Sequence, residues 1–349
     1  MSTVPLGRSA LQLPRLALGA GCFGREIDEV TSWDLLDYAV SRGLNLIDTA
    51  ESYGGGNARE YRKRVYGIDD VREVSGEMHS SEKIIGRWMR ERKNRSAVVL
   101  CTKFITGGTA AQVRDSLRGS LERLQTDYVD IYMLHIPFVN VPIRETLEAL
   151  TAEVKAGRIR TIGCSNFSAA RLREANETAA LHGLARMDST EPSFSLADAA
   201  ARDELFPYCV EQKVSPIIYS PLAAGFLTGK YAKGEPIPKG TRFDVVPGHV
   251  DVYFSDRNFH VVSRLRALGE ELGVPVAKLA MAWAFRQAGV ASVLVGARKR
   301  AHLDNAIEAF DYALDPAIEA RMTEWPYEAF DGQPRQEKLR GAIHKFDKA

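Results

Sequence analysis

Residues 44–54 read Leu44-Asn45-Leu46-Ile47-Asp48-Thr49-Ala50-Glu51-Ser52-Tyr53-Gly54. The first half of this stretch is short and apolar, as in a buried strand, and the second half is polar and ends at a glycine. Lys103 and His135 also stand where an apolar run gives way to a polar segment. Longer amphipathic runs separate the apolar ones, so the sequence indicates strand–helix units repeated around a parallel sheet.

Eight segments along the chain have this strand character. They cover residues 16–21, 44–49, 97–104, 128–135, 159–165, 185–191, 214–220 and 290–296. Helical periodicity occupies segments between them, among which are residues 32–41, 110–124, 143–156, 169–182 and 275–287. Eight strands followed by eight helices predict an α/β fold, the (β/α)8 or TIM barrel.

An open, doubly wound sheet is the competing architecture. Its mark is a Gly-x-Gly-x-x-Gly turn after the first strand, a spacing that Gly19, Gly21 and Gly24 also show. This motif alone therefore does not separate the two architectures, but eight strand segments followed by helices favour the barrel. We therefore expect a single barrel over residues 1–325, with long loops at about 54–80 and 234–258 and a polar tail over 326–349. Loops of this length are usually functional or disordered.

The composition excludes several classes of protein. Lysine and arginine number 46 against 45 acidic residues, so a net charge of +1 offers no basic field for nucleic acid or an anionic membrane. No segment reaches about 18 uninterrupted apolar residues, which argues against a membrane span. The N-terminus lacks a signal-peptide pattern, and the four cysteines lack Cys-x-x-Cys spacing. We expect a cytoplasmic protein with reduced thiols and a small-molecule substrate.

Polar side chains at consecutive strand ends suit proton transfer. Catalytic residues of (β/α)8 enzymes stand at the C-terminal ends of strands, and this is the predicted position of Asp48, Tyr53, Lys103 and His135. A tyrosine, with a pKa of about 10, works as an acid–base group near neutral pH only if its phenolate is stabilised. A nearby lysine does this, and a buried lysine needs a counter-charge such as Asp48. Each residue alone is more often structural, but their joint occurrence favours catalysis.

Six motifs occur in a characteristic order. They are Asp48-Thr49-Ala50-Glu51-Ser52-Tyr53-Gly54, Cys101-Thr102-Lys103, Tyr128-Val129-Asp130 before Leu134-His135, Ile162-Gly163-Cys164-Ser165-Asn166-Phe167, Tyr219-Ser220-Pro221-Leu222 and Val295-Gly296-Ala297-Arg298. In this order the chain resembles the aldo-keto reductase superfamily, over about residues 6–308. The resemblance implies a (β/α)8 barrel that reduces carbonyls with NADPH, without metal or flavin.

The resemblance also implies roles for individual residues. Tyr53 looks like the general acid, tuned by Asp48 and Lys103, and His135 looks like the group that positions the carbonyl. The implied cofactor contacts are Gly21, Cys22, Ser165, Asn166, Glu191, Tyr219, Ser220, Pro221, Leu222, Gly225, Gly296, Ala297, Arg298, Arg300 and Asn305. The implied substrate contacts are Phe23, Tyr53 and His135.

Two of these assignments have structural alternatives. Ser165 and Asn166, implied to bind the nicotinamide carboxamide, would otherwise cap the helix that begins near Ser168. The cations at 298–300 resemble the loop that grips the adenosine 2′-phosphate, which implies NADP(H), but a solvated basic turn has the same composition. Which of the three cations makes that contact is left open.

The chain departs from the family pattern at two places. Glu191 and Phe194 stand where many relatives have Gln and Tyr. A charged Glu191 would favour the oxidised nicotinamide, which makes bound NADPH a stronger hydride donor; alternatively, Glu191 pairs with a cation. The insertion at 54–80 is expected to border the substrate mouth, where it could select a polar or anionic substrate or make a subunit contact. In the second long loop, Arg242 and Phe243 are candidates for contacts with the cofactor or the mouth.

Three other functions are compatible with the same sequence. The same site could oxidise a hydroxyl of a sugar or secondary metabolite, with Tyr53 as the base. The chain could also be a regulatory subunit that binds NADP, as potassium-channel β subunits do, or a barrel that binds a small ligand without a cofactor. The intact set of four catalytic residues favours an enzyme.

Overall fold

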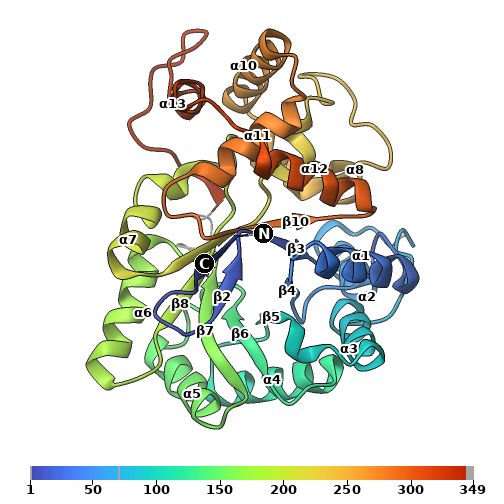
Figure 1. Cartoon of the computed structure of the whole chain (residues 1–349), viewed down its shortest axis with the longest axis vertical. Coiled ribbons are helices and arrows are strands. Elements are labelled where there is room, and N and C mark those ends of the chain that lie inside the picture. The colour runs from blue at the N-terminus through green and yellow to red at the C-terminus, as the bar shows by residue number, and fades with distance from the viewer. Residues whose placement is uncertain (1, 70, 343–349) are drawn as a thin grey trace.

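Eight parallel strands close into a barrel in the computed structural model, which describes residues 2–69 and 71–342 (Figure 1). In barrel order the strands are β3 (Leu16–Gly19), β4 (Leu46–Asp48), β5 (Val99–Phe104), β6 (Val129–Leu134), β7 (Ile159–Ser165), β8 (Met187–Glu191), β9 (Ser215–Ile218) and β10 (Ser292–Gly296). β10 pairs with β3 to close the ring. The predicted (β/α)8 fold is confirmed, and each predicted strand segment contains one strand.

Helices surround the strands in Figure 1. They are α1 (Glu29–Ser41), α2 (Gly55–Tyr66), α3 (Ser80–Arg92), α4 (Ala110–Leu124), α5 (Ile143–Lys155), α6 (Ala169–His182), α7 (Leu205–Gln212), α8 (Arg242–Val245), α9 (Val250–Tyr253), α10 (Asp256–Leu272), α11 (Val276–Arg286), α12 (Arg300–Asp311) and α13 (Pro316–Glu324). Short 3-10 turns cover Arg95–Ala97, Ala200–Arg202, Ala223–Thr228 and Pro247–His249. α12 packs on α1, so the outer layer closes together with the sheet.

Side-chain caps fix where several helices begin. Asp28 accepts a hydrogen bond from the backbone of the first turn of α1, Ser168 does so for α6, and Ser255 does so for α10. Thr109 forms a capping box with Gln112 at the start of α4. These side chains satisfy backbone N–H groups that have no partner inside the helix. The helices therefore begin at defined points after the strands, which keeps most connections short.

Alternation along the strands divides the core into two layers. Residues that point outward pack under the helices. Residues that point inward form an interior cluster, which comprises Leu6, Leu13, Ala17, Leu46, Cys101, Ile131, Met133, Ile217 and Leu294. Because successive side chains of a strand point to opposite faces, the inward-facing position recurs every second residue. This register decides which side chains reach the mouth at the C-terminal ends of the strands.

An N-terminal hairpin closes the opposite end of the barrel. β1 (Thr3–Pro5) and β2 (Gln12–Pro14) pair antiparallel. Leu6 and Leu13 are fully buried among the inward-facing residues of the barrel strands, and Gly7 N donates to Ser215 Oγ at 2.8 Å. The sequence analysis did not predict this hairpin, because three-residue strands are too short to show a periodic pattern.

The two stretches expected as long loops contain helices. α2 occupies residues 55–66, so the first stretch is not a loop throughout. α8, a 3-10 turn, α9 and the start of α10 lie within residues 234–258. The sequence of α2 is strongly polar, and its residues Arg59, Lys63 and Arg64 are exposed. A helix without an apolar stripe gives no periodic signal in the sequence.

The tail lies on the barrel as far as residue 342. Tyr327 donates to Asp203 at 2.7 Å, and Arg257 donates to the backbone carbonyl groups of Pro326 and Glu328 at 3.1 and 2.9 Å. Polar side chains therefore hold this segment, in which the sequence indicated no structure. The rest of the expected tail, residues 343–349, lies outside the described residues.

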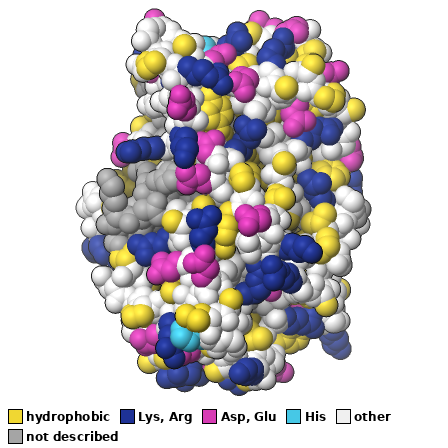
Figure 2. All heavy atoms as spheres, turned by 90° about the vertical axis from the view of Figure 1, so that its left-hand side faces the viewer, with side chains coloured by type: hydrophobic (Ala, Val, Ile, Leu, Met, Phe, Trp, Pro, Cys, Tyr) yellow, Lys and Arg dark blue, Asp and Glu magenta, His cyan; other side chains and the backbone are white. Residues whose placement is uncertain are grey.

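The charges on the surface agree with the nearly equal numbers of basic and acidic residues in the sequence. Lysine and arginine side chains are interspersed with acidic ones on the face shown in Figure 2. Among the described residues, no helix combines the length and the apolar character needed to span a bilayer.

Candidate active site

The register of the strands brings three of the predicted catalytic residues together. Asp48, Lys103 and His135 each stand two residues beyond a member of the interior cluster, so each belongs to the inward-facing series. They follow on three adjacent strands, β4, β5 and β6. Tyr53 stands in the turn after β4, and its backbone N–H donates to Ala50 O at 3.0 Å. The four side chains therefore meet at the C-terminal mouth of the barrel.

The ammonium group of Lys103 lies between two carboxyl groups. Its Nζ donates to the two carboxylate oxygens of Asp48 at 2.7 and 2.6 Å and to the backbone oxygen of Thr49 at 3.0 Å. Oε1 of Glu191 is 3.3 Å from the same nitrogen. All three side chains are almost completely buried. The lysine is therefore compensated inside the barrel, as a buried charge requires.

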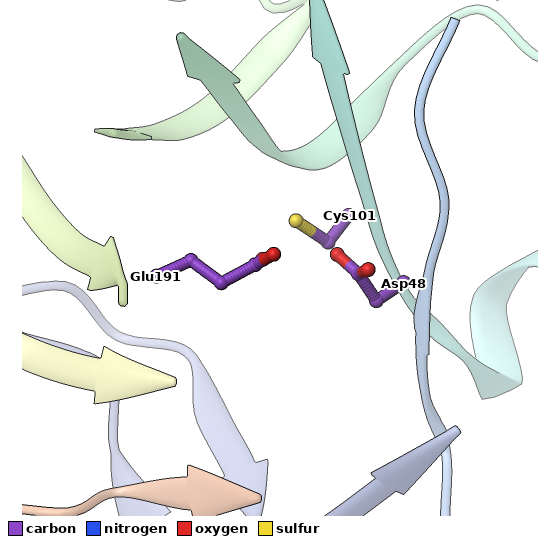
Figure 3. A group of neighbouring side chains, drawn as sticks. All are labelled: Asp48, Cys101 and Glu191. Carbon is purple, nitrogen blue, oxygen red and sulfur yellow. The ribbon is translucent and has the colours of Figure 1, made fainter. Parts of the chain in front are cut away.

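Figure 3 shows the carboxyl groups of Asp48 and Glu191 and the thiol of Cys101 directed toward one another from β4, β8 and β5. Their ligand atoms lie within 4.8 Å of one another, and in the described part of the chain no other group of three such side chains could hold a metal. Lys103 already bonds to Asp48 and contacts Glu191. The positive charge that these carboxyl groups face is therefore an amine.

Burial and charge set the protonation states of this cluster. Burial lowers the pKa of Lys103, but Asp48 and Glu191 raise it more, so the pKa lies well above its usual value and the amine is charged. Burial and the charge of Asp48 raise the pKa of Glu191 well above its usual range, although Lys103 opposes this. The shift favours the uncharged form of Glu191, which leaves Asp48 as the main counter-ion of the lysine.

Tyr53 and His135 lie side by side at the mouth. Their ring centroids are 5.6 Å apart with the rings nearly perpendicular, and Lys103 Nζ is 5.2 Å from the centroid of Tyr53. Burial raises the pKa of Tyr53 to about 12, while Lys103 lowers it. Burial and then Lys103 lower the pKa of His135 to about 3. Near neutral pH the tyrosine therefore holds its phenolic proton and the histidine is an uncharged imidazole.

The predicted nicotinamide contacts form one hydrogen-bonded group. Tyr219 OH donates to Asn166 Oδ1 at 2.8 Å, and Asn166 Nδ2 donates to Ser165 Oγ at 3.0 Å and to His135 O at 2.9 Å. Asn166 has a left-handed backbone, with φ at 63°. The cap of α6 is Ser168, whose side chain accepts from Arg171 N. Ser165 and Asn166 are therefore not the helix cap that the alternative interpretation required.

Glu191 does not face this group with its carboxyl. Its backbone oxygen accepts from Ser165 Oγ at 2.9 Å and from Asn166 N at 3.1 Å, whereas its carboxyl lies against Lys103. The side chain thus pairs with a cation, the second of the two alternatives considered for Glu191. The contact with Lys103 and the raised pKa of Glu191 both reduce the negative charge on which the redox hypothesis depends.

Backbone strain marks the turn after β9. Ser220, Ala223 and Ala224 have φ values of 56°, 50° and 56°, which side-chain-bearing residues rarely adopt, and Gly225 follows with φ at 91°. Ser220 is among the predicted cofactor contacts, and so are Pro221, Leu222 and Gly225 in the same turn. Strained backbone of this kind concentrates at ligand sites because it is maintained only where the surrounding structure enforces it.

Cations gather where the adenosine phosphate is expected. Burial and Arg298 lower the pKa of Lys230. Burial lowers the pKa of His302, and the charges of Lys299, Arg298 and Lys230 lower it further. Positive charges at Lys230, Arg298 and Lys299 therefore lie near one another, and a phosphate would relieve their repulsion. Arg298 also has a carboxylate nearby, because its Nε lies 3.9 Å from Glu26 Oε2. Gly296 and Ala297 lead from β10 into this cluster.

Arg300 and Asn305 are placed less well for that contact. The guanidinium of Arg300 donates through Nε to Asp34 at 2.9 Å and lies over the ring of Tyr38, so it is directed at α1. It must leave that exposed pair to reach a phosphate at Arg298, a cost that is small for a surface ion pair. Asn305 is exposed on α12.

The loop after β3 differs from expectation at Phe23. Its side chain is fully buried in the outer core layer, so Phe23 does not open into the mouth as a substrate contact requires. Cys22 is nearly buried as well, and its Sγ lies 3.1 Å from Ala297 O. Burial and the nearby Glu26 raise the pKa of the Cys22 thiol to about 12, so the thiol stays protonated. It joins the loop after β3 to the residue that follows β10. Gly21 precedes it at the rim.

The two inserted connections meet over the loop after β3. A buried ion pair joins Arg62 of α2 to Glu73. Arg72 Nη1 donates to Asp244 O at 2.9 Å, and Val74 N donates to Arg25 O at 3.2 Å. The first insertion therefore contacts both the second connection and the loop after β3.

The candidates Arg242 and Phe243 have separate structural roles. Arg242 donates to Glu26 Oε1 at 2.6 Å, and burial lowers the pKa of this arginine to about 10. Phe243 is fully buried and packs against the rings of Phe226, Tyr231 and Phe254. An aromatic core therefore anchors the second connection, while Arg242 ties it to the rim of the barrel.

Sequence reasoning missed two residues of the candidate site, Lys230 near Arg298 and Glu51 beside the strand ends. Glu51 is buried, and its Oε1 accepts from Thr106 N at 3.0 Å and from Thr106 Oγ1 at 2.8 Å. Its backbone N–H donates to Lys103 O at 3.0 Å. Glu51 thus holds the loops after β4 and β5 together. Its position in the motif between Asp48 and Tyr53 was the available signal.

Comparison with known proteins agrees with this architecture. The Aldo/keto reductase family matches residues 15–325. The chain is 32% identical to a probable voltage-gated potassium channel subunit beta of Oryza sativa subsp. japonica, over 88% of this chain and 90% of that protein. It is 29% identical to the aldo-keto reductase YhdN of Bacillus subtilis (strain 168), over 90% of each chain, and 28% identical to Protein tas of Escherichia coli (strain K12), over 90% of this chain and 94% of the other.

The protein belongs to the aldo/keto reductase family. Membership supports an oxidoreductase that acts on a small carbonyl compound with a nicotinamide cofactor.

Proposed function

We propose that this protein is an NADPH-dependent reductase of an aldehyde, ketone or sugar carbonyl, with Tyr53 as the proton donor. The observation that carries the proposal is the buried ion pair of Lys103 and Asp48 beside the ring of Tyr53. A lysine held charged at this point stabilises the phenolate that remains after Tyr53 gives up its proton. An ion pair with a purely structural role does not require a tyrosine and an uncharged histidine beside it at the mouth of the barrel.

The side chains divide the work at the carbonyl oxygen. The cofactor, when bound, supplies the hydride to the carbonyl carbon. His135 holds the oxygen by a hydrogen bond, Tyr53 donates the proton to it, and Lys103 with Asp48 stabilises the resulting phenolate. In the oxidative direction Tyr53 is the base instead, so the same residues could oxidise a hydroxyl of a sugar or secondary metabolite.

The residues present fit NADP(H). Ser165 and Asn166 offer hydrogen-bonding groups for the carboxamide, and Tyr219 offers a ring beside them. The mutually repelling cations Lys230 and Arg298 suit the 2′-phosphate. A titration that follows tryptophan fluorescence with NADPH and separately with NADH tests this, and we expect tighter binding of NADPH. Equal affinity for the two would remove the basis for NADP(H).

Substitution of Tyr53 tests the chemistry. We expect Tyr53→Phe to lower the rate of NADPH oxidation with any active carbonyl by about 10²–10⁴-fold, the range of general-acid catalysis, while the dissociation constant of NADPH changes little. Tyr61→Phe, at an exposed position of α2, is the matched control. Full activity of Tyr53→Phe would refute the mechanism.

A regulatory function is the second candidate. The observation in its favour is the similarity to a protein named as a probable voltage-gated potassium channel subunit beta. Slow turnover, a cofactor that survives purification and a stable assembly would together support it. Rapid turnover of a carbonyl, lost in Tyr53→Phe, would support the reductase.

We place the protein in the cytoplasm, without nucleic acid as a partner. The four free, buried cysteines and the net charge of +1 support this assignment. Fractionation of cells in which the protein has been selectively labelled tests the location of the protein.

A further inference from the structure

Ser52 lies beside Tyr53 and contacts His135. Its Oγ is 3.3 Å from His135 Nδ1. Both side chains are partly exposed at the mouth of the barrel. The hydroxyl therefore contacts one particular nitrogen of the imidazole ring.

Backbone hydrogen bonds hold both partners in place. The residues before and after Ser52 each donate a backbone hydrogen bond, to Lys103 O and Ala50 O. His135 N donates to Phe104 O at 2.9 Å, and its carbonyl accepts from an asparagine side chain at 2.9 Å. The backbone positions of both residues are therefore set by the fold.

The contact bears on which nitrogen of the ring carries the proton. An uncharged imidazole has one N–H donor and one acceptor nitrogen. The serine hydroxyl can donate to Nδ1 or accept from it. Where it donates, the proton of the ring stands on Nε2. Among the described residues, Nε2 has no hydrogen-bond partner, and it is not one of the buried polar atoms that lack a partner, so it is accessible to solvent. The free nitrogen is therefore open to the mouth.

We propose that Ser52 is a positioning residue that fixes His135 in the tautomer with the proton on Nε2, so that the ring donates to the carbonyl oxygen of the substrate. The inference rests on the proposed function. A carbonyl oxygen carries only lone pairs, so the opposite tautomer would direct an acceptor at an acceptor. Ser52 thus acts through His135 and not by contact with the reacting atoms.

Two isosteric variants separate the hydroxyl from its bulk. The two variants have nearly the same shape as each other, and each adds one methyl group to the serine. Ser52→Thr keeps the hydroxyl, whereas Ser52→Val has a methyl group in its place. The tautomer is measured without substrate, from the nitrogen chemical shifts of the 15N-labelled imidazoles in the NADP+ complex, with His135→Gln to assign the signals. We expect the proton on Nε2 in the wild type and in Ser52→Thr, and a mixture of tautomers in Ser52→Val.

Kinetics provide the second readout. We expect Ser52→Val to lower kcat/KM for carbonyl reduction by about tenfold, the effect of losing one ordinary hydrogen bond. Ser52→Thr should recover most of that loss. The dissociation constant of NADPH should be the same for both variants, because Ser52 has no part in holding the cofactor.

Two outcomes would overturn the inference. One is a proton on Nδ1 in the wild type, and the other is an Nε2 proton that persists unchanged in Ser52→Val. Failure of the proposed function looks different, because it is seen as full activity of Tyr53→Phe whatever the tautomer of His135.

Discussion

The protonation state of Glu191 matters because its carboxyl lies against the buried ion pair of Lys103 and Asp48. It is one of two carboxyl groups on a single buried lysine, and burial together with Asp48 raises its pKa well above the usual range. Two buried carboxylates cannot share one ammonium group without strong repulsion, so the proton resides on one of them. Asp48 accepts two hydrogen bonds from Lys103, whereas Oε1 of Glu191 lies 3.3 Å from the same nitrogen.

We expect Glu191→Gln to leave the ratio of the dissociation constants of NADPH and NADP+ unchanged, because an uncharged carboxyl and an amide exert similar fields. Fluorescence titration with each form of the cofactor measures this ratio. Glu148→Gln makes the same change at an exposed site of α5 and is the control. A change of about tenfold, equivalent to about 1.4 kcal/mol, would mean that Glu191 is ionised and that its charge acts on the ring.

His135 connects the site to acid stability. Its pKa is about 3 in the folded protein and about 6.5 in an unfolded chain. Between these values the unfolded state binds the additional proton, so the free energy of unfolding falls as the pH drops from about 6.5 toward 3. We expect His135→Gln to unfold at a lower pH than the wild type in circular dichroism. Acid unfolding at the same pH in both would show that His135 is protonated in the fold.

At the scale of elements, the inserted connections are joined to each other and not only to the barrel. Arg72 follows α2 and contacts Asp244 of α8 through both the backbone oxygen and the carboxyl group. Lys239 contacts the same carboxyl at 3.6 Å but belongs to the second connection itself. One of these cations therefore links the two connections, and the other does not.

We expect Arg72→Ala to increase hydrogen exchange in residues 242–253 several-fold, because removing a link between elements raises the population of local opening. Lys239→Ala should leave the exchange unchanged. Mass spectrometry of deuterated peptides measures both. Equal protection in Arg72→Ala and the wild type would show that the aromatic contacts of Phe243 alone hold the second connection.

At the scale of the whole molecule, the N-terminal hairpin completes the core. Leu13 is fully buried among interior residues of β3, β4, β5 and β6. The barrel is therefore packed at its N-terminal end and open at the other, where the four predicted catalytic residues lie. The closed end and the end that carries the predicted catalytic residues are therefore opposite, as is usual for this fold.

We expect Leu13→Ala to lower the free energy of unfolding by about 2–5 kcal/mol, the usual effect of a cavity in a core. Leu181→Ala, at a position of α6 that is 78% exposed, should change it by less than about 0.5 kcal/mol. Chemical denaturation measures both. A loss as small as that of Leu181→Ala would mean that the barrel interior closes around the missing side chain.

The sequence by itself determined the strands, their number and the residues at their ends, because alternation and buried apolar runs are local signals. It also placed Asp48, Tyr53, Lys103 and His135 at one end of a barrel. The charged helix α2 and the short hairpin could not be predicted, since neither has an apolar period of its own. The burial of Phe23 was likewise decided by packing.

Only the tertiary structure decided which groups share a charge or a proton. It directs Glu191 at Lys103 and not at the predicted nicotinamide contacts, and it turns Arg300 toward Asp34. It also brings Ser52 to His135, across 83 positions of sequence. Such pairings depend on register between strands far apart in the chain, and on burial, which changes the pKa of each group. Neither the register nor the burial of a group can be predicted from residue types alone.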